Sequence, residues 1–294
     1  MHARGLKFGL YTSASSLTCQ RRPGSYGFEA VDVERYCYFG ADYIKVDNCG
    51  GTRWPRSNVS WIAMRAAISA CAASGGREQL LSVEYCEAGS DDDCAAWVSG
   101  VADLWRTSPD VQANFLSFMS NLDRNDANVA AQRPGKYNDP DMIVAGLPGV
   151  SIREAQTQFG AWSIAAAPIL LSVDLTQPLP PGVLQIVSNA EVLAVSQDAA
   201  QVQGVRVSAP APSAGECWAR PLADGSVAAL LVNRGDAAAV DVTCSWAELG
   251  LKDPAAPASV RDLWRGADLG SFSGGFTAAA LAPHASMLVK VAQP

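Results

Sequence analysis

Short apolar runs alternate with longer amphipathic stretches along the first two thirds of the chain. Six runs have the length, the β-branched and aromatic content and the flanking turn residues that are typical of buried strands. They are residues 6–11, 43–47, 80–85, 102–107, 139–145 and 168–174. Because helical patterns separate most of these runs, the sequence predicts an α/β domain with a parallel sheet.

The stretches between the runs carry apolar residues at the spacing of amphipathic helices. Ser57 and Asn58 precede one stretch and are expected to cap its helix, and Asp110 precedes the next. The periodic positions are Trp61, Met64, Ile68 and Cys71, then Phe115, Met119 and Leu122, then Gln156, Phe159 and Trp162. Such stripes are more often core than ligand contacts.

The pattern changes at residues 209–212, an Ala-Pro repeat that is typical of a linker. Beyond it, short runs such as 227–233 and 285–291 follow one another without intervening helices. This arrangement indicates a small antiparallel β domain. We therefore predict a first domain over residues 1–205 and a second over 206–294.

Eight cysteines are spread along the chain without a CxxC pair, so disulfides are favoured over a zinc site. They lie at positions 19, 37, 49, 71, 86, 94, 217 and 244. Cys217 and Cys244 are the only two in the predicted β domain, and a disulfide between them is our hypothesis; the alternative is two buried free thiols. The sequon Asn58-Val59-Ser60 adds slight support for a secretory route.

Composition and charge narrow the classes of partner. Only 17% of residues are charged and the net charge is −7, which provides no positive surface for a phosphate backbone. We therefore expect no nucleic-acid partner. No apolar stretch reaches the roughly 18 residues that span a bilayer, so we expect no membrane association either.

The chemistry must come from carboxylates, because His2 and His284 are the only histidines and both lie near the ends of the chain. A Ser-His-Asp or Cys-His mechanism has no base in this sequence, and a His-ligated metal site has no ligands. Candidate carboxylates at predicted strand ends are Asp47, Glu84, Glu87, Asp110, Asp139 and Asp141. Paired carboxylates are what glycoside hydrolysis uses, with no cofactor and no metal. The acidic run 91–93 could suggest calcium, but it lacks spaced oxygen ligands, and a solvated turn is favoured.

Asp47 is the strongest single candidate. It ends the predicted strand 43–47 and precedes a polar, glycine-rich turn at residues 48–51. Loops at the C-terminal ends of parallel strands build the pockets of α/β proteins, so a carboxylate there points to chemistry. The structural alternative is an aspartate that caps the following helix.

Several segments together resemble glycoside hydrolase family 27, the α-galactosidases and α-N-acetylgalactosaminidases, over roughly residues 5–203. Single motifs of this kind are weak, whereas their common order and spacing are highly specific. The matching segments are 5–11 (GLKFGLY), 18–19 with 23–25, 45–49 (KVDNC), 105–110 (WRTSPD), 138–142 (NDPDM), 167–170 and 196–198. The β domain matches in character only.

The resemblance implies a (β/α)8 TIM barrel followed by a C-terminal antiparallel β-sandwich. It identifies residues 6–11 as the third barrel strand, so about six of eight strands are expected here. The two others would precede residue 1 and, in the family, supply a tryptophan and an Asp-Asp pair that grip galactose. On this interpretation the chain is truncated at its N-terminus.

The resemblance further implies Asp47 as the nucleophile and Asp110 as the acid/base of a retaining mechanism. The residues around both agree with these roles. Lys45, two positions before Asp47 on the same strand face, is expected to favour the ionised carboxylate and to bind a sugar hydroxyl. Asp110 follows Pro109 in an apolar setting, where partial desolvation would favour the protonated acid.

Other roles follow from the resemblance alone. Tyr11 is implied as a wall of the sugar site, and Cys19 and Cys49 as a disulfide beside the nucleophile. Arg106 is implied to orient sugar hydroxyls, although a structural salt bridge explains it equally well. Asp141 matches a carboxylate near the reacting face.

Cys86 and Glu87 match positions near the 2-substituent of the sugar. Ala88 departs from the family pattern, because α-galactosidases usually carry Trp after Cys-Glu. A small residue there leaves α-N-acetylgalactosaminidase or β-L-arabinopyranosidase activity open, whereas Glu87 favours the galactosidases.

The function predicted from these observations is hydrolysis of terminal α-D-galactosyl residues. A non-catalytic galactose-binding protein and a different α/β enzyme that uses Glu84 and Glu87 are the alternatives. The expected partner is an α-galactoside, with a second copy of the chain as a further candidate. The expected location is secreted, or in a lysosomal or vacuolar lumen.

Overall fold

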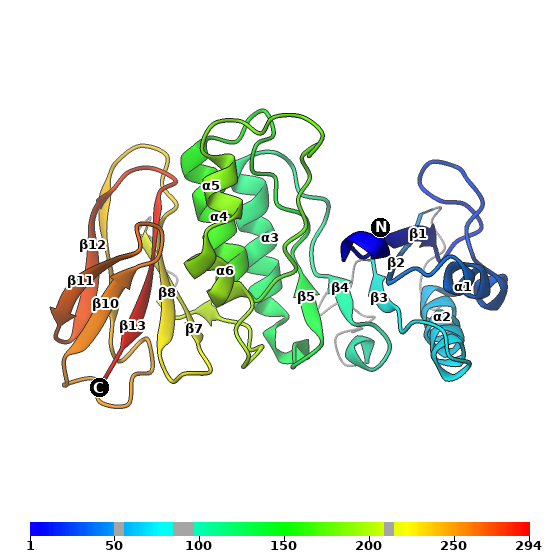
Figure 1. The fold of residues 1–294 in the computed structure, drawn as a ribbon. Helices are drawn as coiled ribbons and strands as arrows, with labels where there is room; N and C mark the ends of the chain where they lie inside the picture. Colours follow the sequence, from blue (N-terminus) through cyan, green and yellow to red (C-terminus); the bar gives the residue numbers. More distant parts are fainter. Residues whose placement is uncertain (50–55, 85–96, 209–214) are drawn as a thin grey trace. The chain divides into compact units, whose positions relative to one another are not determined.

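The computed structural model describes residues 1–49, 56–84, 97–208 and 215–294. The chain forms two compact units, which are described separately. The first comprises Met1–Pro109 with Gly135–Asp139, and the second Asp110–Pro134 with Pro140–Pro294 (Figure 1). The predicted domain boundary after residue 205 stays a prediction.

The first unit is built on a parallel sheet of five strands in the order β1-β2-β3-β4-β5. Each strand pairs with the one that follows it, as expected for βα repeats (Figure 1). The strands are β1 (Gly9–Ser13), β2 (Tyr43–Asp47), β3 (Leu80–Val83), β4 (Leu104–Arg106) and β5 (Tyr137–Asp139). Its helices are η1 (His2–Arg4), α1 (Glu29–Tyr38), α2 (Arg56–Ala73) and η3 (Val98–Gly100).

β2 shows why its sequence forms a strand with one chemical face. Ile44 and Val46 are fully buried, whereas the alternate residues Tyr43, Lys45 and Asp47 are only partly buried. Because successive side chains of a strand point to opposite faces, these three share a face. The aliphatic side chains of β2 therefore pack in the core, and its polar side chains lie together on the opposite, less buried face.

The predicted strands at 139–145 and 168–174 are corrected by the structure. β5 ends at Asp139, because Pro140 has no backbone N–H and Asp141 adopts a left-handed φ of 85° that breaks the extended backbone. The last predicted strand is reduced to a single parallel bridge between Ile143 and Leu171.

The predicted cap of the helix at residues 57–71 is also wrong. α2 begins at Arg56, so Ser57 and Asn58 lie inside the helix. α3 (Phe115–Ala127) is capped by Asn114, whose side chain accepts a hydrogen bond from the backbone N of Ser117. The short polar side chain nearest to the first free N–H groups makes the cap.

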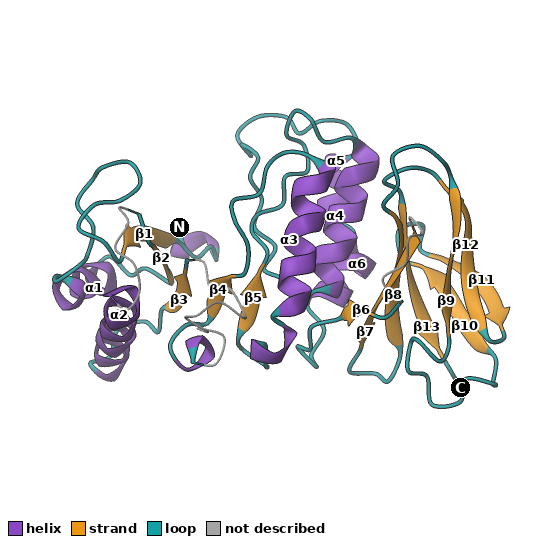
Figure 2. Ribbon diagram, turned by 180° about the vertical axis from the view of Figure 1, so that it is seen from behind, coloured by secondary structure: helices purple, strands orange, loops and turns teal. Residues whose placement is uncertain are grey.

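The second unit combines helices with the antiparallel β domain that the sequence predicts (Figure 2). A six-stranded sheet has the order β11-β10-β13-β8-β7-β6, and β12 pairs with β9. Its strands are β6 (Val205–Arg206), β7 (Gly215–Pro221), β8 (Val227–Asn233), β9 (Val240–Ser245), β10 (Ala258–Asp262), β11 (Ala267–Phe272), β12 (Gly275–Leu281) and β13 (Ser286–Ala292). The other helices are η4 (Val129–Ala131), α4 (Ile152–Ile164), α5 (Val183–Val187) and α6 (Ala190–Ser196).

β8 lies at the centre of this unit, and all seven of its residues are buried. Leu230 belongs to the core that contains Phe159 and Trp162 of α4, whereas Leu231 belongs to the core that contains Trp246. The six-stranded sheet is therefore covered on one face by helices and on the other by β9 and β12 (Figure 2). Such double coverage explains the continuous apolar run of β8.

Three disulfides join described cysteines. The expected pairs Cys19–Cys49 and Cys217–Cys244 are present, with Cα atoms 4.9 and 5.7 Å apart. A third bond links Cys37 of α1 to Cys71 of α2 across 6.3 Å between Cα atoms. In the part of the chain that the structure describes, no helix is long and apolar enough to cross a membrane.

Candidate active site

The carboxylate of Asp47, at the C-terminal end of β2, receives a hydrogen bond on each oxygen. Tyr11 donates from its hydroxyl to Oδ2 over 2.5 Å, and the backbone N of Asn48 donates to Oδ1 over 2.7 Å. Tyr11 comes from β1, where it pairs in register with Lys45. Two strands and one turn therefore fix the orientation of this carboxylate.

Ser13, at the end of β1, holds the turn that follows Asp47. Its hydroxyl donates to the Asp47 carbonyl oxygen over 3.2 Å and accepts from the backbone N of Cys49 over 3.1 Å. The backbone N of Ala14 also donates to that carbonyl over 2.7 Å. Sequence reasoning did not single out Ser13; the signal was a small hydroxyl residue at the end of the neighbouring strand.

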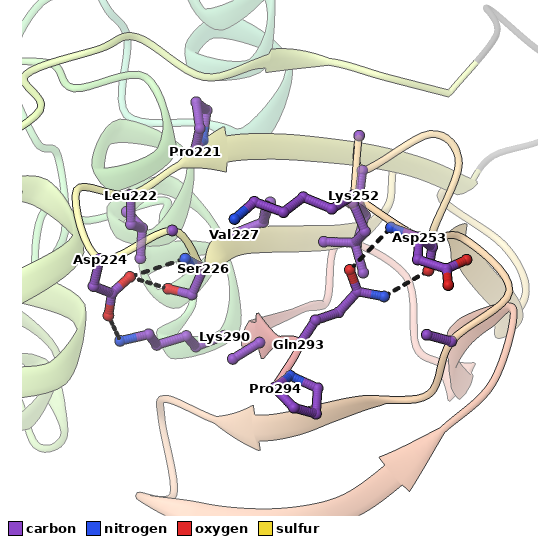
Figure 3. A pocket seen from close by; sticks show the side chains of 16 residues that line it. Pro221, Leu222, Asp224, Ser226, Val227, Lys252, Asp253, Lys290, Gln293 and Pro294 are labelled. Carbon is purple, nitrogen blue, oxygen red and sulfur yellow. Dashed lines mark hydrogen bonds and ion pairs between the residues drawn. The ribbon is translucent and has the colours of Figure 1, made fainter.

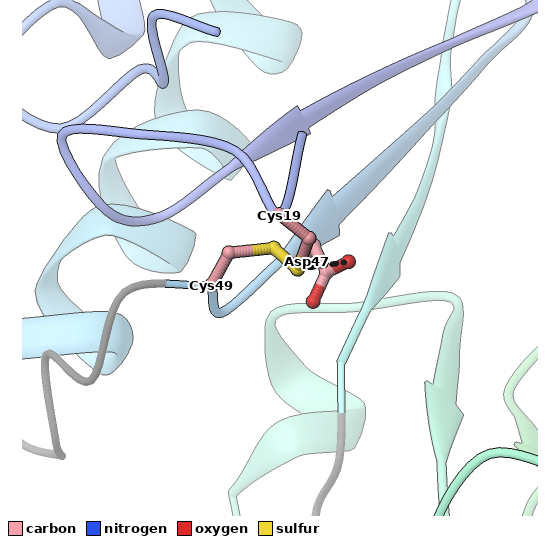
Figure 4. A group of neighbouring side chains, drawn as sticks. All are labelled: Cys19, Asp47 and Cys49. Atoms are coloured by element: carbon pink, nitrogen blue, oxygen red, sulfur yellow. Dashed lines mark hydrogen bonds between the residues drawn. A yellow bond between two sulfur atoms is a disulfide. The ribbon is translucent and has the colours of Figure 1, made fainter. Parts of the chain in front are cut away.

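The Cys19–Cys49 disulfide lies against the nucleophile candidate (Figure 4). Cys19 Sγ is 3.6 Å from Asp47 Oδ2, and potential ligand atoms of Cys19, Asp47 and Cys49 all lie within 4.8 Å of one another. Because the two sulfurs are bonded to each other, they cannot act as the thiolates that a metal would need. The arrangement braces two loops and does not fit a metal site.

The pKa of the Tyr11 phenol is raised by partial burial, and further by its hydrogen bond to Asp47 and the negative charge of that carboxylate. Tyr11 is still 44% exposed, so part of the residue is open to solvent. The hydroxyl therefore remains a hydrogen-bond donor at neutral pH, next to a face that a ligand can reach.

Charged residues of β2 and β4 meet the carboxylate that follows β3. Lys45 Nζ is 3.5 Å from Glu84 Oε2, and Arg106 Nη1 is 3.5 Å from Glu84 Oε1. Arg106 is 2% exposed and also donates from Nη2 to the carbonyl oxygen of Ser108 over 3.0 Å. The salt bridge that was the structural alternative for Arg106 is thus present, which leaves a sugar contact as a prediction.

Asp110 and Asp141 belong to the second unit. Asp141 accepts from the backbone N of Val111 at Oδ2 and from that of Met142 at Oδ1, both over 2.8 Å. Its carbonyl oxygen accepts from Trp162 Nε1 over 2.7 Å. Asp141 therefore braces the segment that begins at Asp110. Asp110 is exposed, so the expected desolvation is not seen.

The structure thus gathers Tyr11, Lys45, Asp47 and Arg106 with the disulfide at the C-terminal ends of neighbouring strands. Asp110 and Asp141 lie together in the other unit. Cys86 and Glu87, predicted near the sugar 2-position, lie outside the described residues, as does Ala88.

A separate groove of about 820 Å³ lies in the β domain (Figure 3). Asp224 at its edge is already bound, because Lys290 donates to it over 2.6 Å and Ser226 donates from both its N and its hydroxyl. These bonds, led by the one from Lys290, lower the pKa of Asp224. No residue predicted for the site lines this groove.

A parallel βα sheet with carboxylates at its C-terminal rim, followed by an antiparallel double sheet, is the architecture of proteins that join a (β/α) barrel to a β-sandwich. Family models agree with this class. The model described as alpha galactosidase A matches residues 1–198, and the alpha galactosidase C-terminal beta sandwich domain matches residues 213–291. The chain belongs to this family, the melibiases of glycoside hydrolase family 27, and it has the fold class expected from the sequence, a (β/α)8 barrel followed by a β-sandwich.

Curated relatives include alpha-galactosidase 2 of Arabidopsis thaliana, 36% identical over 90% of this chain and 64% of the relative. The alpha-galactosidase of Coffea arabica is 35% identical over 100% of this chain and 74% of the relative. This chain spans only 64% and 61% of the Arabidopsis thaliana and Cyamopsis tetragonoloba relatives.

Solved structures show the same fold. Alpha-galactosidase I from Mortierella vinacea superposes with a TM-score of 0.88 at 28% identity, over 99% of this chain and 77% of that one. A β-L-arabinopyranosidase from Geobacillus stearothermophilus has a TM-score of 0.84 at 21% identity, over 99% of this chain and 75% of that one, a likeness of fold alone.

Proposed function

We propose that this protein is a retaining α-galactosidase that removes terminal α-D-galactosyl residues. The observation that carries the proposal is Asp47, an oriented carboxylate at a strand end beside the Cys19–Cys49 disulfide, in a chain whose relatives include alpha-galactosidases. Yeast alpha-galactosidase of the same fold has been crystallised with raffinose, which suggests α-galactosyl oligosaccharides as the substrate class here.

In the proposed first step, a carboxylate oxygen of Asp47 attacks the anomeric carbon while the glycosidic C–O bond breaks. Asp110 gives its proton to the leaving oxygen, and a β-linked galactosyl–Asp47 ester forms. In the second step Asp110 takes a proton from water, which attacks the same carbon and releases Asp47. Two inversions restore the α configuration.

The local contacts support the role of Asp47. Hydrogen bonds from Tyr11 and from the backbone N of Asn48 orient the carboxylate before attack. Lys45 and Arg106 are proposed to bind sugar hydroxyls, and Asp141 to hold the acid/base segment through Val111. Cys86 and Glu87 are proposed to contact the sugar near its 2-position.

The small Ala88 keeps α-N-acetylgalactosaminidase and β-L-arabinopyranosidase as alternatives within the family. Nitrophenyl glycosides of all three sugars separate these activities directly. We also propose a secreted or lumenal location, because three disulfides join described cysteines and these persist in oxidising compartments. A homodimer is the proposed assembly to test by light scattering.

Azide rescue tests the proposed mechanism. Asp47→Gly should abolish hydrolysis of p-nitrophenyl α-D-galactoside, and azide should restore release of nitrophenol with β-galactosyl azide as the product. Glu34→Gln on the exposed surface of α1 is the matched control and should keep wild-type activity. Full activity in a folded Asp47→Gly variant would exclude Asp47 as the nucleophile. Galactose binding by the wild type without turnover would favour the non-catalytic alternative.

A further inference from the structure

Glu84 lies between two cations at the C-terminal rim of the parallel sheet. Its Oε2 is 3.5 Å from Lys45 Nζ of β2, and its Oε1 is 3.5 Å from Arg106 Nη1 of β4. Glu84 itself follows β3, the strand between these two, directly after Val83. One carboxylate therefore ties together side chains from both neighbouring strands.

The contacts use the two oxygens of Glu84 separately, one for each cation. The side chain of Arg106 is 2% exposed, that of Glu84 16% and that of Lys45 32%. Screening by water is weak at the Arg106 end, so the carboxylate offsets the cost of a buried guanidinium there. At the Lys45 end it orients a more accessible ammonium.

Lys45 and Asp47 share one face of β2 and are separated by a single residue. A displacement of the Lys45 ammonium would therefore change the surroundings of Asp47, the proposed nucleophile. Without the carboxylate of Glu84, both of these ion pairs would be lost, and the flexible Lys45 side chain, 32% exposed, would move first.

We propose that Glu84 is a positioning residue, which fixes Lys45 and Arg106 for sugar binding without touching the substrate. This inference rests on the proposed function, because it assumes that both cations bind sugar hydroxyls. It also gives Glu84 a different role from that of a catalytic carboxylate, since each of its oxygens already faces a cation.

Glu84→Gln keeps the size of the side chain and removes its charge, and reductive methylation with peptide mass spectrometry reports the result without any need for activity. We expect Lys45 to be methylated several-fold faster in the variant. Lys136, which donates to Asp103 over 2.7 Å, and the exposed Lys252 serve as internal references and should react at unchanged rates. Glu84→Asp keeps the charge and should restore part of the protection.

Kinetics with p-nitrophenyl α-D-galactoside supplies the second measurement. Loss of positioning should raise KM about tenfold with little change in kcat, because hydroxyl contacts act in the ground state and the transition state alike. A merely structural role would lower kcat in proportion to the misfolded fraction and leave KM unchanged.

Unchanged methylation of Lys45 in Glu84→Gln would overturn the proposal, and so would a loss of kcat at constant KM. The failure of the proposed function has a different signature. In that case the wild type would not turn over the galactoside, yet Lys45 would still become more reactive in the variant, and only the sugar-binding part of the inference would fall.

Discussion

His284 Nδ1 lies 2.7 Å from Oε1 of Glu154, and this contact ties the loop before β13 to the start of α4. The other ring nitrogen, Nε2, lies 2.8 Å from Oδ1 of Asp236, and the ring stacks on Phe115 of α3 with centroids 3.8 Å apart. Ionised carboxylates only accept hydrogen bonds, so the ring satisfies both of them when both nitrogens carry a proton. Within the second unit, this contact joins helices to the β domain.

Glu154→Gln should lower stability in a pH-dependent way. Burial alone would raise the pKa of Glu154, but hydrogen bonds from Ser151 and His284 outweigh it and lower the pKa. The pKa of this carboxyl group is lower in the folded protein than in the unfolded chain, where it is about 4.3, so the ionised group stabilises the fold above that pH. This stabilisation is lost as the pH falls through the folded pKa. We expect a loss of about 1 kcal/mol at pH 6 that shrinks towards pH 3.

Glu248 is the matched control, because it forms the same capping contacts, accepting from the hydroxyl and the backbone N of Ser245 over 2.7 and 2.9 Å. Urea unfolding from pH 3 to 7 measures the loss of unfolding free energy in Glu154→Gln and in Glu248→Gln. Equal losses for Glu154→Gln and Glu248→Gln at every pH would show that the His284 contact adds nothing.

Arg234→Lys should also loosen the attachment of the β domain to α3. Arg234 Nη1 and Nη2 each donate to one oxygen of Asp123 over 2.9 Å, and Nη1 also donates to Glu216 over 3.0 Å. A lysine keeps the charge but cannot form this fork, so we expect a loss of about 1 kcal/mol, limited by the exposure of Asp123.

Arg265→Lys provides the comparison, since Arg265 is largely exposed and reaches Asp262 only at 3.6 Å. Thermal unfolding at low and at high salt should show a lowered Tm for Arg234→Lys and an unchanged Tm for Arg265→Lys. A Tm that is the same for both lysine variants would mean that the fork contributes no stability.

Removal of the Cys37–Cys71 disulfide should destabilise the first unit. The bond closes a loop between residues separated by 34 positions and ties α1 to α2, which pack together. Chain-entropy arguments give about 4 kcal/mol for a loop of this size. A Cys37→Ala/Cys71→Ala double variant should therefore unfold at lower urea, and proteolysis of α1 peptides should accelerate before that of the β domain. Simultaneous cleavage of both regions would contradict this localised effect.

Features that depend on residues close together in the sequence could be predicted, whereas features that depend on contacts between distant segments could not. β2 was found because Ile44 and Val46 alternate with polar residues inside one segment. The end of β5 was missed because Asp141 adopts a left-handed φ, which an apolar pattern does not encode. Eight cysteines allow 105 pairings, so the Cys37–Cys71 bond had to come from the packing of two helices.

The same distinction holds in the candidate site. Asp47 and Lys45 could be read from one strand, and the family resemblance supplied Tyr11 and the Cys19–Cys49 pair. The hydrogen bond from Tyr11 to Asp47 and the support from Ser13 depend on the register between β1 and β2. That register arises from the packing of distant segments and leaves no local mark in the sequence.

Tyr11→Phe tests the contact on which the proposed nucleophile most depends. The variant keeps the ring and removes the donor to Asp47 Oδ2, and a hydrogen bond to a charged group is worth about 1.5–3 kcal/mol, or roughly 10–100-fold in kcat/KM. Because the pKa of Tyr11 is raised above 10, its phenol stays protonated up to alkaline pH, so the loss should be the same at pH 5 and pH 8. Tyr26→Phe, in the loop before α1, is the control and should retain wild-type kcat/KM, as measured with p-nitrophenyl α-D-galactoside. If Tyr11→Phe were as active as Tyr26→Phe, the hydrogen bond would orient Asp47 without contributing to its reactivity, and the proposed role of Tyr11 would have to be abandoned.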